Sequence, residues 1–78
     1  MYQWVTIMAG GPQDGDRIVR AFDKPRMNPP ALRAVDGEVC CPVATHTGVQ
    51  GGCCVVVHPD ATPGQIERAV DAMLADPL

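Results

Sequence analysis

The stretch EVCCPVATHTGVQGGCCVVVHP, residues Glu38–Pro59, decides the fold of this chain. It holds all four cysteines and both histidines, and it is the most apolar and most regularly patterned part of the sequence. Two runs of β-forming residues flank a His-Thr-Gly turn, which is the pattern typical of a β-hairpin. We therefore expect a hairpin here, and we expect it to form the middle of a small α+β domain.

The turn of this hairpin predicts a register. A three-residue loop over residues 46–48 would place Gly48 where a positive φ is needed. It would also oppose Cys41 to Cys53 and Cys40 to Cys54. One face of the hairpin then becomes wholly apolar and the other mixed, as a sheet covered by one helix requires. The apolar face, which we expect in the core, consists of Val39, Cys41, Val43, Cys53, Val55 and Val57.

Pro42 limits the pairing of its strand. It has no N–H to donate, so the strand must be an edge on one side or be interrupted there. Gly51 and Gly52 lie opposite in the expected register, and they indicate a bulge or the close approach of another backbone.

The C-terminal segment predicts an amphipathic helix. Thr62 fits the N-cap, Pro63 the first helical position and Gln65 the third helical position, where its side chain completes a capping box with Thr62. Pro77 should end the helix near residue 75 or 76. A helix this short is marginal in isolation, so its apolar stripe must pack on the sheet. The stripe consists of Ile66, Ala69, Val70, Met73 and Leu74.

The N-terminal part predicts a second hairpin. Residues 2–9 are β-formers, Gly10-Gly11-Pro12 breaks the run, and residues 17–22 alternate again. A short helix over 17–22 is the competing interpretation, because six residues do not separate the two periods. Residues 23–30 contain three prolines and predict a loop across the surface. Residues 31–35 form one helical turn or lead into a strand.

Together these segments predict a single α+β domain over residues 1–78. We expect a small antiparallel sheet of about four strands, arranged as two β-hairpins and covered on one face by the C-terminal amphipathic helix. A chain of 78 residues has no room for a second core, and its stability should be marginal. We see neither a secretory signal nor a membrane-spanning stretch, which predicts a cytoplasmic protein with reduced thiols and no membrane partner.

Several interpretations of the cysteines stay open. The favoured one treats them as small buried hydrophobic residues. Disulfides at 40–54 or 41–53 would fit the expected register in an oxidising compartment. A zinc site would use Cys41, His46, Cys54 and His58, but adjacent strand residues point to opposite faces and the two histidines lie at opposite ends of the hairpin. A reactive thiol is least favoured, because no cysteine belongs to a C-x-x-C motif or a helix N-terminus.

His58 has a candidate polar partner in the expected hairpin. Asp36 falls roughly opposite it in the expected register, so a His–carboxylate pair can form. We favour a structural or solvated histidine over a catalytic one. No Ser/His/Asp order, paired carboxylates or phosphate-binding glycine loop stands out. We therefore expect no catalytic residue, no cofactor and no enzymatic activity.

Charge is unevenly distributed along the chain, whose net charge is −3. Residues 17–33 carry five basic residues and one acidic residue, whereas residues 34–78 carry one basic and six acidic residues. Such oppositely charged parts can be used on a partner or on a copy of the chain itself. The candidate interaction residues are Arg17, Arg20, Lys24, Arg26, Arg33 and Trp4.

These observations predict a small non-enzymatic structural or interaction subunit, oligomeric or part of a larger phage or bacterial assembly. The abundance of Ala, Gly, Val, Pro, Arg and Asp, with a single Lys, suggests a GC-rich genome of that kind. The expected partner is protein, either a copy of the chain or another subunit. One alternative is a nucleic-acid-binding module that uses the basic segment and stacks bases on Tyr2 and Trp4. Another is a small thiol or zinc protein.

Overall fold

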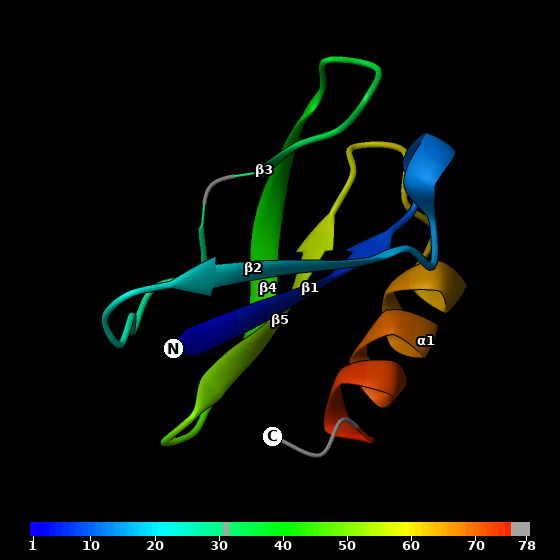
Figure 1. Ribbon diagram of the computed structural model, residues 1–78. Coiled ribbons are helices and arrows are strands. Elements are labelled where there is room, and N and C mark those ends of the chain that lie inside the picture. The colour runs from blue at the N-terminus through cyan, green and yellow to red at the C-terminus, as the bar shows by residue number, and fades with distance from the viewer. Residues whose placement is uncertain (31, 76–78) are drawn as a thin grey trace.

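The computed structural model describes residues 1–30 and 32–75 and shows five strands, one short 3-10 turn and one helix (Figure 1). In chain order these elements are β1 (Tyr2–Ala9), η1 (Gly11–Gln13), β2 (Arg17–Phe22), β3 (Leu32–Arg33), β4 (Val39–Thr47), β5 (Gly51–Val57) and α1 (Pro63–Leu74). The expected α+β class with one C-terminal helix is confirmed. Residues 17–22 form a strand, so the helical alternative there is wrong.

The strands form one five-stranded sheet in the order β2-β1-β5-β4-β3. The pairs β1–β2, β5–β4 and β4–β3 are antiparallel, whereas the central pair β1–β5 is parallel. The expectation of about four antiparallel strands is therefore corrected to five strands in a mixed sheet. Both expected hairpins are present, the central one with a different register. Local sequence does not say how two hairpins join, and they join through the parallel pairing of β1 with β5.

Both central strands are buried on both faces, which explains their continuous apolar sequences. On one face, α1 packs over β1 and β5 and shares a core cluster with them (Figure 1). On the other face, the segment that leads into β3 covers the sheet. There the indole Nε1 of Trp4 donates a hydrogen bond to the carbonyl oxygen of Arg26 at 3.1 Å, so the loop over residues 23–30 is part of this cover.

Gly51 and Gly52 make the central pairing sterically feasible. A Cβ on Gly51 would lie 2.6 Å from the carbonyl oxygen of Gln3, and one on Gly52 would lie 2.9 Å from the ring of Trp4. The two glycines thus mark a close approach of β1, one of the two expected alternatives. The bulge lies in the other strand, where the pairing shifts between Pro42 and Ala44.

The register of the central hairpin differs from the expected one. Thr47 pairs with Gly52 and Cys41 with Val57, so the loop covers residues 48–50. The predicted loop over 46–48 is wrong, and Gly48 does not have a positive φ. The difference comes from packing between distant parts of the chain. Gly51 and Gly52 lie inside β5, beside β1, where a larger residue would clash, and the turn is therefore shifted toward the C-terminus.

Part of the predicted core is exposed, because α1 lies mainly over β1 and β5 and leaves most of β4 uncovered, with Ala44 as the β4 residue that reaches the α1-side cluster. Val39 and Val43 are each 55% exposed, Leu74 is 68% exposed, and Cys41 is also exposed, so these four assignments to the core are wrong. The remaining residues of the list behave differently. Cys53, Val55 and Met73 are buried, and Val57, Ile66 and Val70 are half-buried against the same cluster.

The start of α1 has the predicted capping box. The Thr62 hydroxyl oxygen accepts a hydrogen bond from the Gln65 amide at 3.3 Å, and the Gln65 side chain accepts one from the Thr62 amide at 2.9 Å. Pro63 occupies the first helical position. Pro77, which we expect to end the helix, lies outside the described residues, as does residue 31.

The glycine contact with Trp4 leads to a stability prediction. We expect Gly52→Ala to lower the free energy of unfolding by about 1–3 kcal/mol, because the new methyl group overpacks a fully buried ring. Gly64→Ala is the control: its Cβ meets nothing within 4 Å and it lies in a helix, so stability should stay level or rise by less than about 1 kcal/mol. Urea denaturation measures both. A Gly52→Ala variant as stable as the wild type would contradict the steric role of this glycine.

Candidate functional site

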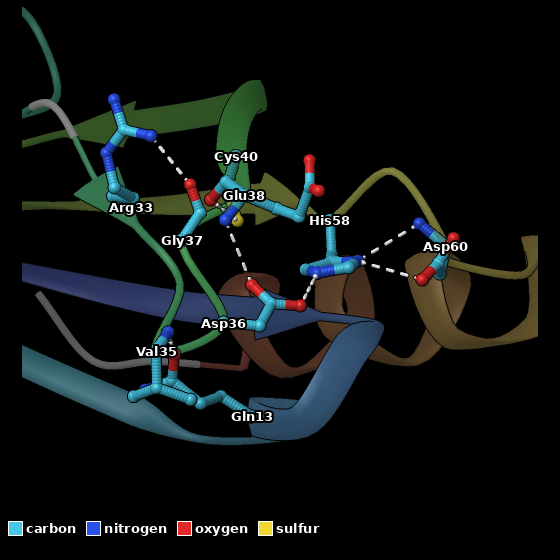
Figure 2. Close-up of polar contacts among 9 residues, drawn as sticks. All are labelled: Gln13, Arg33, Val35, Asp36, Gly37, Glu38, Cys40, His58 and Asp60. Atoms are coloured by element: carbon cyan, nitrogen blue, oxygen red, sulfur yellow. Dashed lines mark hydrogen bonds and ion pairs between the residues drawn. The ribbon is translucent and has the colours of Figure 1, made fainter.

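The side chain of His58 is buried and held at both ring nitrogens (Figure 2). Its Nε2 lies 2.7 Å from Oδ2 of Asp36, and its Nδ1 accepts a hydrogen bond from the Asp60 amide at 3.0 Å. Because Nδ1 accepts, the ring proton sits on Nε2 and is donated to the carboxylate. The His–carboxylate pair anticipated from sequence therefore forms, with one defined tautomer.

Asp36 is fixed from its other side as well. Its Oδ1 accepts a hydrogen bond from the Glu38 amide at 3.0 Å, within the turn between β3 and β4. The pKa of Asp36 is held below its usual value, first by this amide and then by His58. The same turn is closed by Arg33, whose guanidinium donates to the Gly37 carbonyl at 2.6 Å. The pair thus ties the β3–β4 turn to the end of β5.

Glycines close the space around His58. A Cβ on Gly11 would lie 2.5 Å from carbon atoms of the imidazole, and one on Gly10 would lie 2.4 Å from Ala61. Both glycines have positive φ, so other residues would also be strained there. The glycine pair therefore packs against the β5–α1 connection and leaves no room for a ligand at the ring. With both nitrogens engaged, His58 is suited to positioning chain segments.

The four cysteines form no disulfide with one another, and they lie in distinct environments. Cys40, Cys53 and Cys54 are buried, whereas Cys41 is exposed on β4. The disulfides considered at 40–54 and 41–53 are not supported, because Cys41 pairs with Val57. Burial raises the pKa of both Cys40 and Cys54. Cys54 also lies 3.5 Å from the Thr6 hydroxyl, a contact with no signal in the sequence. These buried thiols are poor nucleophiles.

The four candidate zinc ligands do not come together. Cys41 and His46 lie on the α1 side of the sheet, opposite Val57 and Cys53, whereas Cys54 lies in the cluster on the other side. His58 is engaged with Asp36 beyond the end of β5. Within residues 1–30 and 32–75, no three His, Cys, Asp or Glu residues are arranged to hold a metal ion.

The five basic residues between positions 17 and 33 do not all lie on one part of the surface. Arg17 pairs with Ile7, whose side chain faces α1, whereas the guanidinium groups of Arg20 and Arg26 lie 5.5 and 4.9 Å from the ring centre of Phe22. Arg33 lies on β3, at the opposite edge of the sheet, and Lys24 is exposed in the loop after β2. The rings of Trp4 and Tyr2 are not accessible for stacking with bases, since Trp4 is 0% and Tyr2 5% exposed. Arg20, Lys24 and Arg26 thus stay near Phe22, whereas Arg17 and Arg33 lie elsewhere on the sheet.

An exposed apolar surface lies beside α1 on the β4 side, and we call it the β4–α1 face. The β4 side chains at 39 and 41 project on the side of the sheet that α1 covers, and Val43 follows them as the extra residue of the bulge; all three are exposed. At about 100° per residue, the helix positions 66, 70 and 74 form the flank of α1 next to β4. The face consists of Val39, Cys41, Val43, Ile66, Val70 and Leu74.

The opposite flank of α1 is more polar. A shallow groove of about 250 Å³ lies there between α1 and the β1–β2 hairpin. It contains Arg17, Gln65 and Arg68, and Arg68 lies 4.0 Å from the Asp14 carboxylate. The two sides of the helix are therefore chemically distinct, and only the β4 side carries a row of exposed apolar side chains.

Comparison of the chain with known protein families, curated proteins and solved structures found no match. In the described part of the chain, no helix has the length and apolar character needed to cross a membrane.

The Asp36–His58 pair leads to a prediction for Asp36→Asn. An amide offers one oxygen and one NH₂ group, but its two neighbours here, the Glu38 amide and the imidazole Nε2–H, are both donors. In either orientation, the NH₂ group of the new asparagine would therefore point at another hydrogen-bond donor. We expect the urea midpoint of the variant to fall at pH 7, while that of Asp23→Asn, at an exposed loop position, stays unchanged.

The same pair should depend on pH. Because the pKa of Asp36 is lowered by folding, its contribution to stability is present above the unfolded-state pKa, near 4, and is lost as pH falls through the folded-state value. The stability difference between wild type and Asp36→Asn should therefore shrink below about pH 4. A difference that is constant from pH 7 to pH 2 would contradict this role for the carboxylate.

The thiols give a separate prediction. In dilute native protein we expect one thiol to react rapidly with a disulfide reagent and three to react only on unfolding, because only Cys41 is exposed. Cys41→Ser should abolish the rapid phase and leave the three slow thiols. Two or more rapid thiols in the native wild type would contradict the burial of Cys40, Cys53 and Cys54.

Proposed function

We propose that this chain is a small non-enzymatic interaction subunit that binds a protein partner through the β4–α1 face. One observation carries the proposal: Val39, Val43 and Leu74 are each more than half exposed, on two neighbouring elements, β4 and α1. Small monomeric domains rarely expose grouped apolar side chains, and where they do, the group commonly marks a protein interface.

The width of the sheet supports the proposal that a partner covers β4. A helix with its side chains is about 10 Å wide, and neighbouring strands lie about 4.8 Å apart, so one helix covers about two strands. α1 covers β1 and β5, the two central strands of five. The next strand on one side, β4, keeps its apolar side chains at 39 and 43 uncovered. A further layer placed over β4 would complete the core on this side.

The partner is expected to cover this face rather than extend the sheet. Beyond its short pairing with β3 at residues 39–40, β4 has no second strand partner among the described residues. Such an edge could pair with another chain. However, Pro42 removes one donor from β4, and the bulge beside it breaks the regular spacing, which are two features that discourage edge pairing.

The polar sites favour a binding role over catalysis. Both nitrogens of His58 are engaged in contacts that hold chain segments together, and the pKa values of Cys40 and Cys54 are raised by burial. The composition, with its single Lys, favours membership of a phage or bacterial assembly in the cytoplasm.

Site-specific photocrosslinking tests this function. We would place a benzophenone amino acid at position 43 and, as a matched control, at position 19, because Val43 is 55% and Val19 56% exposed and both lie in strands. In cells of the source organism, position 43 should give discrete crosslinked protein products, and position 19 should give few. Mass spectrometry identifies the products. Equal or absent crosslinking at the two positions would overturn the assignment of the β4–α1 face as an interface.

A further inference from the structure

We infer that the partner on the β4–α1 face is a second copy of this chain, related by a two-fold axis that runs along the boundary between β4 and α1. This inference rests on the proposed interaction function and specifies its partner. Its basis is the charge on the two margins of the face, together with the relative direction of β4 and α1.

The margin beyond β4 is basic. Arg33 pairs with Val39, so its side chain lies on the same side of the sheet as that exposed valine. The neighbouring acid, Glu38, alternates to the other side together with Cys40, which is buried in the second cluster. The guanidinium of Arg33 reaches the Gly37 carbonyl and is exposed to solvent.

The margin beyond α1 is acidic. Glu67 and Asp71 are exposed, and at about 100° per residue they lie next to Val70 and Leu74 on the side away from the sheet. Arg68, the one cation of this helix, points to the other flank, where it approaches Asp14. The apolar face is therefore bordered by a cation on one side and by two carboxylates on the other.

β4 and α1 run in the same direction. β5 is antiparallel to β4, and α1 turns back along β5 after the short connection from His58 to Thr62 (Figure 1). The start of β4 and the first turns of α1 therefore lie at the same end of the sheet. Arg33, which pairs with the first residue of β4, lies at this end of the sheet, and Glu67 is the acidic residue of α1 nearest to it.

A two-fold axis along the boundary uses these features together. It lays α1 of each copy over β4 of the other. Because the rotation leaves each residue's position along the axis unchanged, Arg33 of each copy approaches Glu67, the nearest acidic residue of the other copy's α1. The interface is isologous and closes at two copies. An axis across the boundary would instead bring α1 against α1 and set the acidic margins side by side, which is unfavourable.

The required area is modest. A stable dimer buries roughly 800 Å² on each partner, and the chain exposes 4698 Å² in total. About a sixth of the surface would thus be covered. The six residues of the face form the apolar centre, and the charged margins form the polar rim that such interfaces have.

A charge-exchange experiment tests this arrangement. Sedimentation equilibrium of the purified full chain would compare the wild type, Arg33→Glu, Glu67→Arg and the double variant Arg33→Glu/Glu67→Arg. Arg20→Glu serves as a control on β2, far from the face. Circular dichroism and urea denaturation confirm that each variant is folded. The rate at which Cys41 reacts with a thiol reagent gives a second readout, because Cys41 lies within the face.

We expect the wild type to dimerise, each single exchange on the face to weaken dimerisation by about tenfold or more, and the double variant to return to within about threefold of the wild type. Arg20→Glu should dimerise normally, and labelling of Cys41 should slow as protein concentration rises. A monomeric wild type at millimolar concentration overturns the self-pairing, as does a double variant no better than the single ones. Crosslinks from position 43 to a different protein would also overturn it, while the proposed interaction function would stand.

Discussion

The contact of Trp4 with Gly52 is the constraint on which the rest of this structure depends. The indole is fully buried, and the chain provides two glycines, which have no side chain, at the point where the ring must lie. Because these glycines are the start of β5, β1 and β5 are brought together in parallel. This pairing joins the two hairpins into one sheet, and the hydrogen bond from the indole to Arg26 holds the covering loop in place.

Local signals predicted the elements, because each depends on residues close together in the chain. The capping box at Thr62 and the break at Gly10-Gly11-Pro12 are such signals, and the helix and the first hairpin follow them. The register of the central hairpin could not be predicted in this way. A turn at residues 46–48 is locally favourable, but it is outweighed by the packing of Gly51 and Gly52 beside β1, which involves residues about fifty positions away.

The pair of His58 and Asp36 shows that a correct contact can follow from an incorrect register. In the expected hairpin the two residues are cross-strand neighbours, whereas in the structure Cys41 already pairs with Val57, which would place Asp36 well past His58. The contact forms because the β3–β4 turn folds back toward the end of β5, where the Glu38 amide orients the carboxylate. The residue types predicted the pair. The path of the chain that brings Asp36 to His58, however, depends on the loop over residues 23–30, which packs over Trp4.

The exposed valines of β4 connect fold and function. In the sequence they alternate with Cys40 and Pro42, as in a strand with one buried face. This alternation led to the prediction that the valines lie in the core beneath the helix. One helix covers only about two strands, however, and the parallel pairing puts β1 and β5, not β4, beneath α1. The apolar pattern of β4 is therefore that of a core strand whose covering helix is not supplied by its own chain. In the two-fold arrangement, α1 of a second copy supplies that helix, and the apolar alternation of β4 is then accounted for in full.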